Sequence, residues 1–279
     1  MKKISRRSFL AAAGLSVAAL ALTACGGSAS SVASSVASSA ASSEAASTSA
    51  AAGELTTVEA GKLTMATNAA FPPYEMTTDA GEFEGIDIET AQAIADKLGL
   101  ELQIDDMDFD AALLSVQQGK ADIVMAGVTV TDERKAVMDF SDSYATGIQS
   151  IIVPEGSDIA SPDDLAGKKI GTQRGTTGYI YCSDDFGDDN VVAYDDGLTA
   201  VQALNNGQVD AVVIDNAPAK EFVAANPGLV ILDTSYAEED YAIGMAKGSS
   251  LEDAVNATLE ELKADGTLQA IVDKYITAE

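Results

Sequence analysis

The feature that most constrains the fold is an order of strands and helices that occurs twice along the chain. The first occurrence predicts strands at 62–67, 100–104 and 121–126 and helices at 88–98 and 110–118. The second predicts strands at 169–172, 191–194 and 209–214, a helix before the middle strand and another at 197–206. Strands that alternate with helices form βαβ units with parallel sheets. The repeated order therefore predicts two α/β lobes.

The two occurrences also match at the level of single residues. The matching positions are Leu113, Val116, Gly119 and Asp122 in the first and Val201, Leu204, Gly207 and Asp210 in the second. In both, the glycine stops a helix whose apolar residues recur at helical spacing. A strand at 241–246 and helices to 264 and from 267 to about 276 follow, and they either extend the second lobe or return to the first.

The first 53 residues are predicted to be an export signal followed by a flexible tether. Residues 1–24 combine a basic start with an apolar run too short to span a bilayer. The run ends in Leu22-Thr23-Ala24-Cys25, which resembles the lipobox of bacterial lipoproteins and predicts lipidation of Cys25. The alternative to a lipoprotein signal is a secretory peptide with an incidental cysteine. Because Arg6-Arg7 resembles a twin-arginine motif, export by the twin-arginine route and export by the Sec route both stay open. Residues 25–53, rich in Ser and Ala, are expected to be a flexible tether.

Composition excludes several classes of function. Acidic residues outnumber basic ones by 44 to 16, which gives a net charge of −28 and argues against a nucleic-acid partner. The chain has no histidine, so histidine-dependent triads and metal sites are excluded. We expect no cofactor and no bound metal. The acidic clusters, among them Glu238-Glu239-Asp240, are interpreted mainly as solvated surface, since none has the spacing of a calcium loop.

Strand ends show where a ligand would bind. In open parallel sheets, ligands bind outside the carboxyl ends of the strands. Four predicted strands end at Asn68, Gly127, Gln173 and Asp215, and two facing lobes would bring these ends around one cleft.

Residues near these ends offer both signs of charge. Arg134 can hold a carboxylate in a bidentate fork, and Asp215 can hold an ammonium group. Phe71 and Phe109 offer apolar walls. Thr129, Thr176 and Thr177 offer hydroxyl or backbone N–H groups. This set of groups suits a zwitterionic ligand. Asp215 also has the position of a helix N-cap, so it has an alternative structural role. Tyr74, Tyr144 and Tyr241 are interpreted as packing or hinge residues.

The body of the chain resembles the bacterial extracellular solute-binding proteins of family 3, which serve ABC importers of polar amino acids. The resemblance covers nearly all of residues 60–277. The motifs that carry it are Thr67-Asn68-Ala69-Ala70-Phe71-Pro72-Pro73-Tyr74-Glu75, Gly85-Ile86-Asp87-Ile88-Glu89, Gly119-Lys120-Ala121-Asp122-Ile123, Thr129-Val130-Thr131-Asp132-Glu133-Arg134, Gly175-Thr176-Thr177 and Ala264-Asp265-Gly266-Thr267.

The resemblance implies a two-lobed periplasmic-binding-protein (type II) fold with two hinge strands. It places lobe 1 at 54–145 plus 240–279 and lobe 2 at 149–236. It implies that Arg134 binds the ligand α-carboxylate with the N–H groups of the turn at Thr176 and Thr177, and that Asp215 binds the α-ammonium with help from Gly127 and Thr129. It further implies that Phe71 stacks on the ligand side chain and that Phe109 lines the same pocket.

Two positions bear on which ligand is bound. Family members that bind basic amino acids often carry an acidic residue at the position of Asn68, so Asn68 weighs against an arginine or lysine ligand without excluding it. Gln173 has the chemistry to hydrogen-bond a polar side chain. We therefore expect a polar L-amino acid, without naming one.

The expected protein is a monomeric, non-enzymatic receptor on the outer face of the plasma membrane or in the periplasm, anchored through Cys25. It would deliver the amino acid to the membrane subunits of an ABC permease. One alternative is an enzyme on the same fold, such as a dehydratase. It would need a poised acid or base in the cleft, and the sequence shows neither a histidine nor a spare cleft glutamate. The other alternative is a sensory module that reports a ligand without transport.

Overall fold

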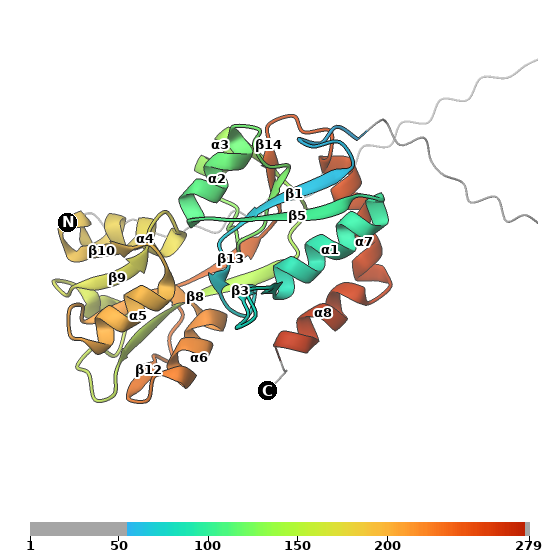
Figure 1. Ribbon diagram of the computed structural model, residues 1–279. Coiled ribbons are helices and arrows are strands. Elements are labelled where there is room, and N and C mark those ends of the chain that lie inside the picture. Colours follow the sequence, from blue (N-terminus) through green and yellow to red (C-terminus); the bar gives the residue numbers. More distant parts are fainter. Residues whose placement is uncertain (1–54, 277–279) are drawn as a thin grey trace, which may run out of the picture. The chain divides into compact units, whose positions relative to one another are not determined.

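The structure is a computed structural model that describes residues 55–276. The predicted export signal, the tether and Cys25 lie outside the described residues. Within 55–276, no helix has both the length and the apolar character needed to cross a membrane. The strands of this region form two larger sheets with helices packed against them (Figure 1).

The first sheet contains the first of the two predicted βαβ arrangements. Its strands, in spatial order, are β5 (Glu101–Asp106), β1 (Lys62–Thr67), β6 (Ile123–Val124), β14 (Gly244–Ala246) and β7 (Met138–Phe140). β1 pairs in parallel with both β5 and β6, whereas β14 runs antiparallel to its neighbours. A small antiparallel sheet of β2 (Ala70–Phe71), β3 (Glu75–Thr77) and β4 (Phe83–Glu84) follows β1.

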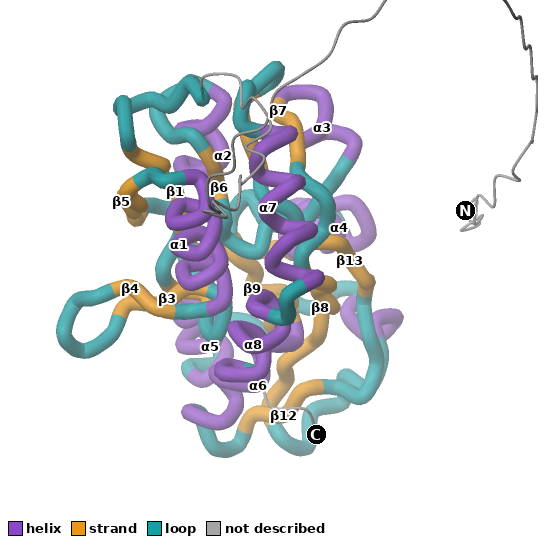
Figure 2. The backbone as a smooth tube through the Cα atoms, turned by 90° about the vertical axis from the view of Figure 1, so that its right-hand side faces the viewer, coloured by secondary structure: helices purple, strands orange, loops and turns teal. Residues whose placement is uncertain are grey.

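Side chains of this sheet alternate between two cores because successive residues of a strand face opposite sides. Leu63 and Met65 pack with the buried face of α1 (Ile86–Leu98), and Ala66 packs with α2 (Phe109–Gln117). The C-terminal helices α7 (Glu252–Ala264) and α8 (Thr267–Tyr275) pack against α1 (Figure 2). They therefore lie on the first sheet, which decides between the two placements that the sequence leaves open.

The second sheet repeats this arrangement. Its strands are β10 (Val191–Tyr194), β9 (Ile170–Gln173), β11 (Ala211–Asp215), β8 (Ala145–Pro154) and β12 (Leu229–Ile231), with β13 (Ala237–Tyr241) also paired to β8. Ile151 and Val213 face α4 (Thr177–Phe186), whereas Ile152 and Val212 face α5 (Gly197–Asn205) and α6 (Asn216–Ala225). The remaining elements are α3 (Asp132–Val137) and the 3-10 turns Pro162–Leu165 and Asp188–Asn190.

Two antiparallel strands carry the chain between the sheets. After β7 the chain leaves the first sheet and enters β8 of the second. β13 pairs with the first half of β8, from Ala145 opposite Tyr241 to Gln149 opposite Ala237. The prediction of a single strand at 241–246 is wrong. The chain ends β13 at Tyr241 and begins β14 at Gly244, because these two strands belong to different sheets.

The chain passes closely over itself where α1 begins. The N–H groups of Ile86 and Asp87 donate to the carbonyl oxygens of Pro73 and Tyr74, at 3.1 and 2.8 Å. Gly85, at φ 131°, makes this possible, since a Cβ atom there would lie 2.2 Å from the Tyr74 carbonyl oxygen.

We expect Gly85→Ala to lower the free energy of unfolding through two costs. An L-residue with positive φ costs about 1–2 kcal/mol, and the clash of its Cβ atom adds roughly 1–3 kcal/mol of overpacking. Gly81→Ala is the matched control, since Gly81 has φ 80° and no atom within 4 Å of its added Cβ. Urea unfolding of both variants makes the comparison. Equal losses would show that the close approach at Gly85 has no energetic weight.

Candidate ligand-binding site

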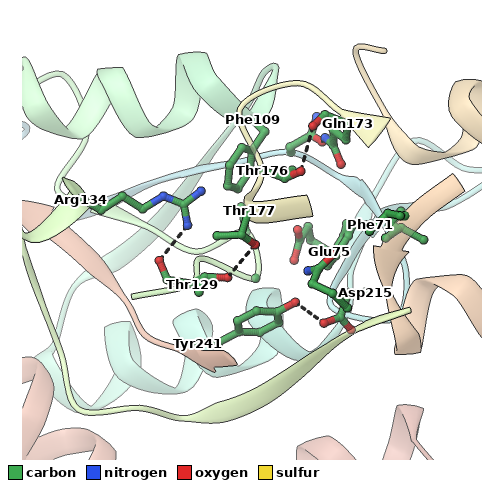
Figure 3. A pocket seen from close by; sticks show the side chains of 16 residues that line it. Phe71, Glu75, Phe109, Thr129, Arg134, Gln173, Thr176, Thr177, Asp215 and Tyr241 are labelled. Atoms are coloured by element: carbon green, nitrogen blue, oxygen red, sulfur yellow. Dashed lines mark hydrogen bonds between the residues drawn. The ribbon is translucent and has the colours of Figure 1, made fainter. Parts of the chain in front are cut away.

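A pocket lies where the two sheets face each other (Figure 3). Residues from both sheets line it: Asn68, Phe71, Glu75, Phe109, Ala126, Gly127, Thr129, Arg134, Gln149, Gln173, Thr176, Thr177, Val213, Ile214, Asp215 and Tyr241. The structure thus brings together all of the residues predicted for ligand binding: Asn68, Phe71, Phe109, Gly127, Thr129, Arg134, Gln173, Thr176, Thr177 and Asp215.

Strand ends account for this convergence. Asn68 directly follows β1, Gln173 is the last residue of β9 and Asp215 is the last residue of β11. Gly127 comes three residues after β6, at φ 55°, and a Cβ atom there would approach the rings of Phe71 and Tyr241 to 3.0 and 3.1 Å. The carboxyl ends of parallel strands therefore supply most of the polar groups, as the topology predicts.

Arg134 projects into the pocket from the short helix α3. Thr131 caps this helix by accepting a hydrogen bond from the Arg134 N–H. The guanidinium donates to two backbone carbonyl oxygens, those of Thr129 at 2.7 Å and Gly175 at 3.1 Å, and its carbon lies 5.3 Å from the centre of the Phe109 ring. Only 8% of the residue is exposed. Burial lowers the pKa of Arg134, and the nearby Glu239 carboxylate opposes this effect.

Asp215 supplies the opposite charge and is only 2% exposed. Its Oδ1 accepts a hydrogen bond from the Ala217 N–H at the start of α6, and its Oδ2 accepts one from the Tyr241 hydroxyl at 2.6 Å. The residue therefore both caps a helix and lines the pocket, as the sequence allowed. Burial raises its pKa to about 6.

Glu75 is a pocket residue that the sequence analysis missed. The statement that the cleft has no spare glutamate is wrong, because Glu75 is 0% exposed and lines the pocket. Neither of its carboxyl oxygens has a hydrogen-bond partner. Burial raises its pKa well above the usual value, and the neighbouring Asp87 carboxylate raises it further. Its place in the Phe71-Pro72-Pro73-Tyr74-Glu75 motif was the available signal, since a motif beside the cleft contains it.

Asp87 is held by two donors that lie far from it along the chain. It accepts hydrogen bonds from the Tyr144 hydroxyl, at 2.7 and 2.8 Å, and from the Gly127 N–H at 3.0 Å. Burial raises its pKa to about 6. Asp87 thus fixes the turn at Gly127 and connects it to Tyr144, the residue that precedes β8.

Several direct hydrogen bonds join the lobes across the pocket, the Tyr241–Asp215 bond among them. Gln173 Nε2 donates to Asn68 Oδ1 at 2.8 Å, and Arg134 donates to the Gly175 carbonyl oxygen. A Cβ atom at Gly175 would lie 3.2 Å from the Cβ of Asp110 on α2. The lobes therefore touch along one rim of the pocket.

Two further residues near the pocket are placed differently from the sequence interpretation. Tyr241 ends the hinge strand β13, as a hinge residue would, but it also lines the pocket and holds Asp215. Glu239 is 7% exposed, so the interpretation of its acidic cluster as solvated surface is wrong for this residue. Strand alternation explains the error, because Glu238 and Asp240 on either side of Glu239 are exposed.

Known proteins with this fold are two-lobed periplasmic binding proteins. Residues 63–278 match the model of the bacterial extracellular solute-binding proteins, family 3, and the chain belongs to this family. The L-cystine-binding protein TcyJ of Escherichia coli is 33% identical over 226 residues, which cover 79% of this chain and 85% of that protein. The arginine-binding extracellular protein ArtP of Bacillus subtilis is 33% identical over 228 residues, with 78% and 87% covered.

Solved structures show the same fold. The arginine-, lysine-, histidine-binding protein ArtJ of Geobacillus stearothermophilus is 34% identical, with a TM-score of 0.75 and coverage of 78% of this chain and 96% of that one. An ancestral arginine-binding protein bound to arginine is 42% identical, with a TM-score of 0.74 and coverage of 77% and 98%. These likenesses establish an α/β fold with two lobes for this chain.

The raised pKa of Asp215 predicts how affinity for a ligand with an ammonium group depends on pH. Such a ligand favours the ionised carboxylate, so binding releases a proton below about pH 6, and affinity rises with pH until about 6. The expected slope is at most about tenfold per pH unit. Calorimetry on the unaltered protein and on Asp215→Asn checks this. We expect weaker binding and a flatter pH profile in the variant, and an equal slope in both proteins would contradict the assignment.

Proposed function

We propose that this protein is an extracytoplasmic receptor that closes around a polar L-amino acid and delivers it to an ABC permease. The observation that carries the proposal is a buried cation and a buried anion lining one pocket, Arg134 and Asp215. Each is costly to bury without a partner. A zwitterion whose carboxylate meets Arg134 and whose ammonium meets Asp215 neutralises both.

The side chain of the ligand would then extend toward the other end of the pocket. Figure 3 shows Arg134 on one side and Phe71, Glu75 and Gln173 on the other. Phe71 offers an apolar face, whereas Gln173 and Glu75 offer hydrogen-bonding groups. Glu75 is fully buried and its pKa is raised, so a polar side chain that hydrogen-bonds with its carboxyl group fits best there.

The names of the relatives support an amino-acid ligand and a range of polar side chains. They include binding proteins for cystine, arginine, glutamine and, in Neisseria gonorrhoeae, a probable histidine-binding protein. The name of the glutamine-binding relative and that of an arginine-binding relative from Escherichia coli also refer to ABC transporters, which supports a permease as the partner. This family background favours binding without turnover, so we propose a receptor rather than an enzyme.

Closure would occur about the two connecting strands. We propose that lobe 1 comprises 54–145 plus 240–279 and lobe 2 comprises 149–236, with β8 and β13 as hinges. The pairing of these strands between the two sheets supports this division. Entry of a ligand would require the Gln173–Asn68 and Arg134–Gly175 hydrogen bonds to break and re-form. We further propose that the receptor acts as a monomer without a cofactor or metal.

A screen of the purified protein against the standard amino acids plus cystine, ornithine and citrulline tests the proposal. A ligand with a Kd near 1 μM adds roughly 4 kcal/mol of stability at millimolar concentration, a shift of several degrees in Tm. Calorimetry then measures affinity, and chromatography of the released ligand shows whether it is unchanged. Uptake by membrane vesicles carrying the permease tests delivery. No stabilisation by any amino acid would overturn the proposal, and chemical conversion of the ligand would favour the enzyme.

We expect Arg134→Ala to abolish binding of the amino acid found in the screen, since truncating one partner of a buried charge pair costs roughly 2–5 kcal/mol. Arg174→Ala is the matched control. Arg174 is half exposed and lies 3.6 Å from Asp195 at the protein surface, so its loss should leave affinity nearly unchanged. Calorimetry compares the two variants. Similar affinities in both would overturn the placement of the carboxylate.

We also propose that Cys25 carries the lipid that holds the protein at the membrane, as its lipobox-like sequence indicates. Acylated lipoproteins are retained because two or more chains anchor stably. We expect Cys25→Ala to move the protein from the membrane fraction to the soluble fraction of bacterial cells. Mass spectrometry of the unaltered protein should show an acylated N-terminal Cys25. An unmodified cysteine would support the secretory-peptide alternative.

A further inference from the structure

Glu239 is a buried carboxylate that meets both lobes and a hinge strand. Its Oε2 accepts hydrogen bonds from the Thr129 hydroxyl at 3.1 Å, the Thr177 hydroxyl at 2.9 Å and Gln149 Nε2 at 3.0 Å. Thr129 lies beside the first sheet, Thr177 begins α4 on the second, and Gln149 lies on β8. Glu239 itself lies on β13 and is not among the residues that line the pocket.

The contacts with Glu239 decide in which direction the hydroxyl protons of Thr129 and Thr177 point. A threonine hydroxyl has one proton to donate and two lone pairs that accept. Because a carboxylate only accepts, the protons of Thr129 and Thr177 are both directed at Oε2. Both residues line the pocket, so toward any ligand their oxygens act as acceptors.

The positions of these acceptors suit an ammonium group. The two hydroxyl oxygens lie 3.5 Å apart, close enough for a single nitrogen to donate to both. The carboxylate of Asp215 lines the same pocket and can take a third N–H. A ligand carboxylate, by contrast, would find no donor in either hydroxyl and would remain at Arg134.

We propose that Glu239 is a positioning residue that fixes the hydroxyl groups of Thr129 and Thr177 as hydrogen-bond acceptors, and thereby makes the site select ligands with an α-ammonium group. The inference deepens the proposed amino-acid receptor and rests on it. It assigns the selection for an α-ammonium group to Glu239, which does not line the pocket and acts through Thr129 and Thr177, which do. The third donor, Gln149, holds the Glu239 carboxylate in place from the hinge strand.

Glu239→Gln tests the inference because it keeps the shape and adds an N–H donor. The amide can donate to one threonine, whose own proton then turns toward the pocket. We expect affinity for the bound L-amino acid to fall about 10- to 100-fold, as when hydrogen bonds to a charged group are lost. Affinity for the analogue without the α-amino group should change less than about threefold, since that analogue makes no such bonds.

The probes are L-arginine with 5-guanidinopentanoate, L-glutamine with 5-amino-5-oxopentanoate, and L-histidine with 3-(imidazol-4-yl)propanoate. The pair whose amino acid binds the unaltered protein is used. Competition calorimetry at millimolar analogue gives both dissociation constants. The readout is the dissociation constant of the analogue divided by that of the amino acid. A loss of structure alone would lower both affinities together and leave this ratio unchanged.

Glu238→Gln is the matched control, because it removes the same charge from the neighbouring, exposed position of the same strand. We expect it to leave the ratio unchanged. Thr177→Val, which replaces the hydroxyl with a methyl group of similar size, provides a second route. It should lower the ratio even if Glu239→Gln does not fold, as judged by circular dichroism.

An unchanged ratio in folded Glu239→Gln, including an equal loss of affinity for both ligands, would overturn the inference. If Glu239→Gln does not fold, an unchanged ratio in Thr177→Val would overturn it. If no amino acid binds the unaltered protein, the proposed function fails and this inference fails with it. Normal amino-acid binding with an unchanged ratio would refute the role of Glu239 alone.

Discussion

Two buried charges of opposite sign, separated from each other, constrain the rest of this structure. Arg134 and Asp215 come from different lobes, and their own contacts are with neutral groups: backbone carbonyl oxygens for Arg134, and a hydroxyl and an N–H for Asp215. These contacts solvate the charges, and the nearby Glu239 carboxylate also favours the charged form of Arg134. The fold therefore holds two groups in a low-dielectric pocket whose electrostatic energy falls when a molecule with matching charges lies between them.

The hinge strands take part in the chemistry of the pocket as well as in its movement. Tyr241 at the end of β13 holds Asp215, and Glu239 two residues earlier holds Thr129 and Thr177. Tyr144, just before β8, holds Asp87, which in turn fixes the Gly127 turn. The bonds from Tyr241 to Asp215 and from Thr177 to Glu239 connect β13 to residues of the second lobe, so a rotation of that lobe would strain them, whereas the Tyr144–Asp87–Gly127 contacts lie within the first lobe.

Sequence patterns predicted most of the regular elements and ten of the residues that line the pocket, though not Glu75, for physical reasons that particular elements illustrate. Helix α1 was predictable because its apolar residues recur at helical spacing and Gly99 ends it in a left-handed conformation. The convergence of Asn68, Gln173 and Asp215 followed from parallel strands ending on one side. The ten-residue strand β8 was not assigned from its pattern, because its first half alternates and its second half is uniformly buried.

The missed residues share a cause. Glu75, Asp87 and Glu239 are buried carboxylates, and composition alone assigns an acidic residue to the surface. Their burial depends on partners that lie far along the chain, such as Tyr144 for Asp87 and Thr129 for Glu239. Only the assembled fold reveals such pairings. The same holds for the hydrogen bond between Asn68 and Gln173, which no spacing rule predicts.

The Asn68–Gln173 hydrogen bond has a kinetic consequence. It joins the two lobes directly, so it favours the closed arrangement whatever ligand is inside. Departure of a bound molecule must first break this bond, so its strength contributes to the dwell time of every ligand alike. Asn68 and Gln173 also line the pocket, so the bond that holds the lobes together is made by side chains that face the ligand space. A substitution at either position would therefore change the dwell time of the ligand and the polarity of the pocket together.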